Sequence, residues 1–174
     1  MTFRRGIFTA LAVTTTTGLL LTACSSHDEG DVDATQNTSL NITTPSGAKI
    51  TMPTEPQNAL GFYSTDFDLL LTLGIDTADT QPIRDGVDQF PDFFPVDADR
   101  DLTTYPSYPD YDLEATASAE PDFILNCLGF KDDLDERLQA IAPTYTFDSF
   151  ADEDWRDSAE KVASDLDRTD QWQE

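Results

Sequence analysis

Three tyrosines lie close together in a proline-rich stretch, in the order Tyr105-Pro106-Ser107-Tyr108-Pro109-Asp110-Tyr111. Phenol rings can line a pocket for a flat or catecholate ligand, and their hydroxyl groups remain free to form hydrogen bonds. The same rings can instead pack against one another and hold a proline-rich loop in shape. Both interpretations stay open at this point, and Tyr105 and Tyr108 are candidate ligand-binding residues.

Arg84 is one of only ten basic residues, against 34 acidic ones, in a chain of 174 residues. A guanidinium group can hold the oxygens of an anionic ligand bidentately. Asp85 and Asp88 follow closely, however, and a surface ion pair with either would explain Arg84 equally well. Arg84 is therefore a candidate ligand contact with an equally good structural alternative.

Other kinds of chemistry lack the residues they need. The single histidine, His27, lies in a polar N-terminal stretch, so a catalytic nucleophile in the folded part would have no histidine base. One histidine and two cysteines are too few for a His/Cys metal site or a disulfide framework. A formal net charge of -24 argues against nucleic acid as a partner, because its phosphates require a basic face. With 34 acids, a pair of carboxylates arises by chance, so a surface hydrolase remains only an alternative.

The first 23 residues have the pattern of a secretory signal. A short basic start with Arg4 and Arg5 precedes an uncharged stretch, residues 6–23, that ends in small residues. Its end, Leu21-Thr22-Ala23-Cys24, resembles the lipobox of bacterial lipoproteins, in which cleavage falls before the cysteine and the cysteine is lipidated. An ordinary signal peptide or a membrane anchor is the alternative, but the run of four threonines at 14–17 weakens a membrane span.

This N-terminal pattern predicts residues 1–23 as a lipoprotein signal peptide and Cys24 as the lipidation site. Residues 24–39 are polar, acidic and without periodicity, and we expect them to form a tether between the lipid and the folded part. The expected location is the extracytoplasmic face of the cell membrane, held by the lipid anchor.

The rest of the chain shows the spacing of an α/β protein. Alternation around the turn residues Pro45-Ser46-Gly47 predicts a β-hairpin over 40–43 and 49–52. Apolar runs predict buried strands at 59–62, 123–127 and 144–147. Apolar residues at helical spacing predict helices at 64–73 (capped by Ser64 or Thr65), at 111–119, at 132–141 and from about 152 onward. Residues 82–109 show no period and are predicted to form a long loop. Strands and helices in alternation indicate a parallel sheet.

In open parallel sheets, ligands bind beyond the carboxyl ends of the strands. This rule selects Tyr63 and Ser64 after the first buried strand and Phe130 after the second as further candidate ligand-binding residues. Cys127, at the end of the second strand, is expected to be a buried small hydrophobic residue without a chemical role.

The order of these motifs resembles the substrate-binding lipoproteins of ABC importers for ferric siderophores, haem and cobalamin. The matching segments cover about residues 40–174 and are Met52-Pro53-Thr54-Glu55-Pro56, Asp68 to Ile75, Leu113-Glu114, Glu120-Pro121-Asp122-Phe123-Ile124-Leu125, Ile141-Ala142-Pro143-Thr144 and a helix with Trp155. Two positions depart from the family pattern, because Gln57 and Glu120 stand where the family usually has basic residues.

The resemblance implies two α/β lobes joined by a long helix, with a ligand such as a ferric siderophore or haem held between them. Residues 40–151 would then be the N-terminal lobe and residues 152–174 the start of the inter-lobe helix, so that the chain is expected to be truncated there. Its implied partners are an ABC permease and ATPase, and it implies neither enzymatic activity nor a resident cofactor or metal. An acid on the outer face of this lobe docks on the permease in that family, a role that falls to Glu114. Alternatively, Glu114 only interacts favourably with the dipole of its helix. The chain as a whole could also be a remnant that binds no ligand.

Overall fold

The computed structural model describes residues 38–96, 100–131, 133–151 and 154–174. The predicted signal peptide, Cys24 and all but the last two residues of the predicted tether lie outside the described residues. No helix in the described part is both long enough and apolar enough to cross a membrane.

Three short parallel strands form the centre of the fold. They are β3 (Ala59–Gly61), β6 (Phe123–Asn126) and β7 (Thr144–Thr146), and they pair in the order β3-β6-β7. Every residue of the three strands is buried. A strand that is covered on both faces reads as a continuous apolar run, so the sequence signal was strong. The predicted α/β fold with a parallel sheet is confirmed.

Two further strands correct the prediction of an unbroken loop over 82–109. β4 (Thr80–Ile83) and β5 (Thr103–Pro106) pair with each other in parallel. The prediction was wrong at both ends of the segment because each strand contains a proline, Pro82 or Pro106. Proline removes an N–H group from the strand ladder and normally argues against a strand.

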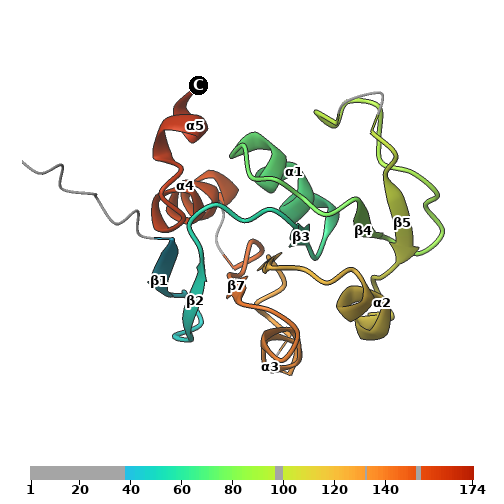
Figure 1. Cartoon of the computed structure of the whole chain (residues 1–174), viewed down its shortest axis with the longest axis horizontal. Helices are drawn as coiled ribbons and strands as arrows, with labels where there is room; N and C mark the ends of the chain where they lie inside the picture. Colours follow the sequence, from blue (N-terminus) through green and yellow to red (C-terminus); the bar gives the residue numbers. More distant parts are fainter. Residues whose placement is uncertain (1–37, 97–99, 132, 152–153) are drawn as a thin grey trace, which may run out of the picture. The chain divides into compact units, whose positions relative to one another are not determined.

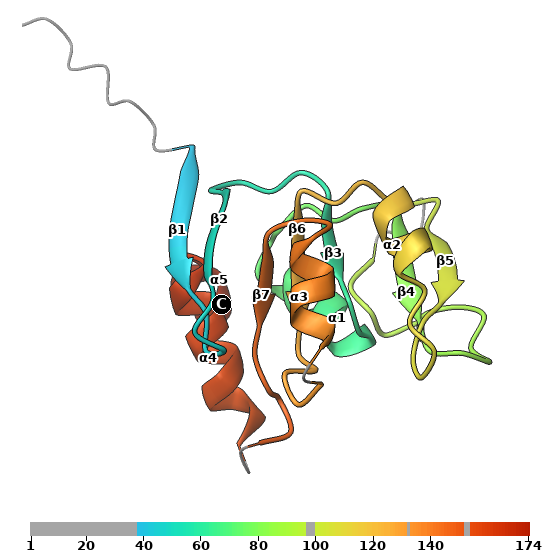
Figure 2. The same ribbon diagram turned by 90° about the horizontal axis from the view of Figure 1, so that it is seen from below.

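The side chain of Gln81 joins β4 to the central sheet. The backbone N–H of Gly61 donates to Gln81 Oε1 at 3.0 Å, and Gln81 Nε2 donates to the carbonyl of Ala59 at 3.1 Å. Gln81 is completely buried, so its amide takes the place of the backbone ladder between β3 and β4. The strands therefore lie side by side in the order β5, β4, β3, β6 and β7 (Figure 2).

Helices cover both faces of this strand layer. Helix α1 (Ser64–Thr72) lies on one face, and α2 (Leu113–Ser118) and α3 (Leu134–Gln139) lie on the other (Figure 1). Gly74 has a φ of +64°, which only glycine adopts without strain, and it follows the last residues of α1, close to the predicted end of this helix at residue 73. The predicted hairpin is also present, as β1 (Ser39–Thr43) and β2 (Lys49–Pro53) in antiparallel register.

The C-terminal segment forms two helices rather than the single helix that the sequence predicts. Helix α4 (Trp155–Asp165) ends at Leu166, and α5 (Thr169–Gln173) follows after a turn in which Asp167 has a φ of +58°. The guanidinium group of Arg168 is buried at this turn. It donates to the carbonyl of Thr54 at 3.1 Å and forms an ion pair with Glu55 at 2.5 Å. This contact with a distant segment ties down the turn where the helix breaks.

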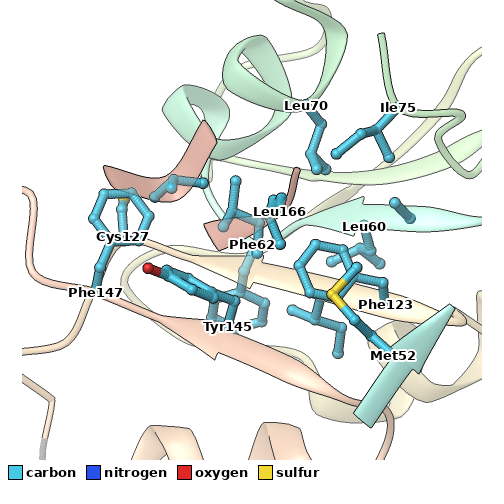
Figure 3. Close-up of a cluster of buried hydrophobic side chains, with 14 of the residues drawn as sticks. Met52, Leu60, Phe62, Leu70, Ile75, Phe123, Cys127, Tyr145, Phe147 and Leu166 are labelled. Atoms are coloured by element: carbon cyan, nitrogen blue, oxygen red, sulfur yellow. The ribbon is translucent and has the colours of Figure 1, made fainter. Parts of the chain in front are cut away.

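One hydrophobic core joins the hairpin, the three central strands and helices α1, α3 and α4. Met52 from β2, Phe123 from β6, Tyr145 from β7 and Leu166 after α4 all point into it (Figure 3). Cys127 is buried in the same cluster, as the sequence predicts.

Candidate functional site at the carboxyl edge of the sheet

The strand order reverses at β3. From β3 the chain runs through α1 to β4 and β5 on one side, and then through α2 to β6 and β7 on the other. The connections after β3 and β6, through α1 and α3, lie on opposite faces of the strand layer (Figure 1). Such a switch point is where open α/β sheets bind ligands. We use the name carboxyl-edge site for the residues that directly follow the five strands.

Aromatic rings gather at one half of the carboxyl-edge site. The Tyr63 ring meets the Tyr108 ring edge-on, with centroids 5.7 Å apart, and Tyr108 meets Tyr111 in the same way at 6.1 Å. Tyr111 in turn stacks on the buried Phe62 at 5.4 Å. Tyr63, Tyr108 and Tyr111 are half-buried and come from the loops after β3 and β5. The structure thus brings together two of the predicted ligand-binding tyrosines from segments that are 45 positions apart in the sequence.

Arg84 lies beside this tyrosine cluster. It directly follows β4, and the next residue, Asp85, donates its backbone N–H to the carbonyl of Tyr108 at 3.0 Å. The Arg84 side chain is exposed and forms no ion pair with any described residue, Asp85 and Asp88 included. No described side chain therefore neutralises its charge.

Tyr105 is not part of the cluster. It lies within β5, is 8% exposed, and shares a 2.9 Å hydrogen bond between its hydroxyl and Thr116 Oγ1 on α2. Burial raises the pKa of its phenol to about 12. Its ring packs β5 against α2, which favours the packing interpretation of Tyr105, and a role in ligand binding stays an untested prediction.

A second aromatic group lies at the other half of the carboxyl-edge site. Phe130, after β6, meets Phe150, after β7, edge-on at 5.6 Å, and the two rings are 45% and 64% exposed. The two loops are joined by the backbone N–H of Gly129, which donates to the carbonyl of Phe147 at 2.9 Å. A Cβ atom on Gly129 would come within 2.8 Å of that carbonyl oxygen, so only glycine permits this approach.

The first turn of α1 connects the two halves. Ser64 is its first residue and is half-buried, but the residue that caps the helix is Tyr63, not Ser64 or Thr65 as the sequence suggests. Asp66 reaches back to this cap: its Oδ2 accepts the backbone N–H of Tyr63 at 2.9 Å. The same oxygen accepts the backbone N–H of Cys127 at 3.2 Å. One carboxyl group therefore holds the loops after β3 and β6 together.

Buried polar atoms without a partner concentrate at this edge. In the described part of the chain they are Asp66 Oδ1, Ser107 Oγ and the Tyr111 hydroxyl, and all three follow β3 or β5. Buried polar atoms in folded proteins are nearly always hydrogen-bonded to protein or to ordered water, so these three atoms can each bind a water molecule or a ligand. The described residues contain no group of histidine, cysteine and acidic side chains that could hold a metal ion.

A cavity of about 560 Å³ opens beside Phe150, between α1, α4 and α5. Its walls include Leu69, Trp155 and Trp172, and the two indole rings meet edge-on at 6.4 Å. Trp155 is 55% exposed there, so its ring is not fully packed on the core.

Residues 83–174, more than half of the chain, match the family model described as periplasmic binding protein. This chain belongs to the periplasmic binding protein family. The match confirms the family that the motif order predicts, and it includes Arg84, Tyr108, Glu114 and Phe130. No curated protein matches the sequence significantly.

Several solved structures share the fold. Holo-ViuP has 23% sequence identity and a TM-score of 0.60 over 76% of this chain and 45% of its own. The siderophore-binding protein BauB, solved with acinetobactin and ferric iron, has 19% identity and a TM-score of 0.56 over 78% and 48%. PiaA of Streptococcus pneumoniae, an iron uptake ABC transporter substrate-binding protein, has 18% identity and a TM-score of 0.58 over 77% and 46%. This periplasmic binding protein thus spans slightly less than half the length of these structures.

Glu114 follows the tyrosine cluster of this periplasmic binding protein along the chain and is not among the residues that line it. It occupies the first turn of α2, is exposed, and forms no ion pair with any described residue. Asp112 caps the helix by accepting the backbone N–H of Ala115 at 2.9 Å. The cap is thus already supplied, and the Glu114 carboxylate is free for another partner.

Sequence reasoning missed Phe150, Asp66 and Ser107. Phe150 follows a predicted strand, so the rule that selected Phe130 would have found it. Asp66 resembles an ordinary acid in the first turn of a helix, and nothing in its neighbours predicts that β6 covers it. No sequence signal distinguishes Ser107 from other loop serines.

Proposed function

We propose that this protein is the solute-binding component of an ABC importer and that it holds a ferric siderophore or a related iron chelate at the carboxyl-edge site. The observation that carries the proposal is the pairing of a tyrosine cluster with the unpaired cation of Arg84 in a chain of net charge -24. An acidic surface repels anions at long range, so a free arginine beside aromatic rings is a specific feature.

The chemistry of the site matches such a ligand. Catecholate and related siderophores are flat and, as ferric complexes, often anionic. Tyr63 and Tyr108 offer ring edges and hydroxyl groups, Phe130 and Phe150 offer apolar faces, and Arg84 offers charge-assisted hydrogen bonds. The relatives BauB and PiaA bind or import iron compounds, as their descriptions state, which supports the same class of ligand here.

Anchoring and docking complete the proposal. Lipidation of Cys24 would hold the protein on the extracytoplasmic face of the cell membrane, with residues 24–39 as a tether and residues 40–151 as the binding lobe. Glu114 would pair with an arginine of the permease. In a reconstituted importer, Glu114→Lys should abolish the stimulation of ATPase activity, whereas Glu136→Lys on α3 should not.

Calorimetry with a ferric tris-catecholate complex tests the binding proposal, with the iron-free chelator as a control. Because Arg84, Phe130 and Phe150 are open to solvent, the described residues contact a ligand from one side only. We therefore expect saturable but weak binding, with a dissociation constant of roughly high-micromolar to millimolar size.

Arg84→Gln should weaken this binding by about tenfold or more, the cost of losing a hydrogen bond to a charged group. Arg137→Gln is the matched control, because Arg137 lies in the last turn of α3 and pairs with Asp133. Absence of saturation by any ferric complex at millimolar concentration would contradict the function. Equal losses in the two variants would contradict only the site.

A further inference from the structure

Among the described residues, Asp66 is the only acidic residue in the buried core, and none of its surface is exposed. Its Oδ2 accepts the backbone N–H groups of Tyr63 and Cys127, while its Oδ1 has no hydrogen-bond partner. Tyr63 belongs to the loop after β3, and Cys127 begins the loop after β6. The carboxyl group therefore bridges the two loops that border the switch point.

The surroundings of Asp66 contain no cation that could stabilise its charge. The strands that make the main contacts with α1, namely β3, β4 and β6, carry no charged residue. From the β4–β5 loop, Phe90 and Phe94 pack on the neighbouring Phe67. The titratable group that faces Asp66 is the Cys127 thiol, and burial raises the pKa of that thiol far above its usual range. Burial likewise raises the pKa of Asp66 to about 7, although hydrogen bonding from the backbone N–H and the thiol of Cys127 and from the backbone N–H of Tyr63 opposes this effect.

We propose that Asp66 is a positioning residue of the carboxyl-edge site and that loss of its proton loosens the junction between the loops after β3 and β6. The neutral acid is compatible with a dry environment. The carboxylate leaves a charged Oδ1 without a donor, and it is stabilised by any opening that lets water reach it. Tyr63 moves with this junction, so the arrangement of the tyrosine cluster becomes sensitive to pH.

Residue-resolved amide hydrogen exchange on the complete protein between pH 5 and 8.5 tests the proposal. After correction for base catalysis, protection of the Tyr63 and Cys127 amides should fall by up to about tenfold per pH unit until the pH passes the pKa of Asp66, and then level off. Amides of the β1–β2 hairpin report opening elsewhere in the molecule. No ligand is added, so the outcome is independent of the proposed iron chelate.

Two variants make the test specific. Asp66→Asn keeps an oxygen that can accept both N–H groups but cannot ionise, so protection at Tyr63 and Cys127 should no longer depend on pH. Asp68→Asn is the matched control on the same helix, because its carboxylate accepts no hydrogen bond from either loop, and it should retain the dependence. The carboxyl ¹³C shift of Asp66 should titrate near pH 7. A midpoint near 4, or an unchanged pH dependence in Asp66→Asn, would overturn the proposal.

Discussion

Asp66→Asn should remove a pH dependence from the stability of the folded protein. The pKa of Asp66 is raised by burial from 3.8 to about 7, so the folded protein keeps this proton over a pH range in which the unfolded chain has lost it. The folded state then binds more protons than the unfolded state, and the free energy of unfolding falls as the pH rises from about 4 to about 7. Above that range Asp66 is ionised in both states, and it no longer changes the free energy of unfolding as the pH rises.

The size of the effect follows from the same values. A rise of about three pH units, at about 1.4 kcal/mol per unit, corresponds to about 4 kcal/mol. Asparagine cannot ionise, so the stability of wild type relative to Asp66→Asn should fall by about 4 kcal/mol between pH 4 and pH 8. The comparison is between variants because the other 33 acids also repel one another more strongly as the pH rises, and this part cancels.

Urea unfolding followed by circular dichroism at constant ionic strength provides the measurement. Asp68→Asn should show a smaller change in the same direction, because burial raises the pKa of Asp68 while a large part of its side chain remains in contact with solvent. If the difference between wild type and Asp66→Asn stays within about 1 kcal/mol across the range, Asp66 is not held neutral by burial and the reasoning fails.

The remaining predictions concern the close contact of β3, the role of Tyr105, the anchor and the surface charge. Gly61→Ala should destabilise the protein by about 3 kcal/mol in urea unfolding, because a Cβ atom there would lie 2.5 Å from the Phe67 Cα. Gly47→Ala is the control: Gly47 lies in open space at a φ of +86°, so this change should cost only about 1 kcal/mol in the same assay. Tyr105→Phe should cost about 1 kcal/mol through the lost hydrogen bond to Thr116 and leave chelate binding unchanged, and a loss of binding would restore Tyr105 to the site. Cys24→Ala should release the protein from the membrane fraction, and unchanged fractionation would refute lipidation. The melting temperature should rise between 0.1 and 1 M salt as repulsion among the acids is screened, and a constant value would mean that this repulsion is unimportant.

Local signals in the sequence were sufficient for much of the fold. The hairpin follows from the alternation of residues around Pro45-Ser46-Gly47. The parallel sheet follows from short, continuous apolar runs, which are typical of strands that are covered on both faces. The position of Tyr63 and Phe130 at the carboxyl edge follows from the same topology, because residues after parallel strands must emerge at one edge. Each of these inferences depends on a residue and its near neighbours.

What the tertiary structure alone decided depends on contacts between segments far apart in the chain. Strand β4 exists despite Pro82 because the Gln81 amide bonds to β3, about 20 positions earlier. The break between α4 and α5 is tied by Arg168 to Thr54 and Glu55, more than 110 positions away. Tyr105 and Tyr108 look alike in the sequence, yet only the position of α2 makes one a packing residue.

Asp66 shows most clearly which properties follow from neighbours in the sequence and which depend on distant contacts. Its place three residues after Tyr63 is enough to predict a bond to the start of α1, because the first turn of a helix leaves N–H groups unpaired. Its second bond, to Cys127, and its complete burial arise only when β6 pairs with β3. The ionisation of a side chain depends on the solvent and charges around it, and these are fixed by the whole fold rather than by its neighbours in the sequence.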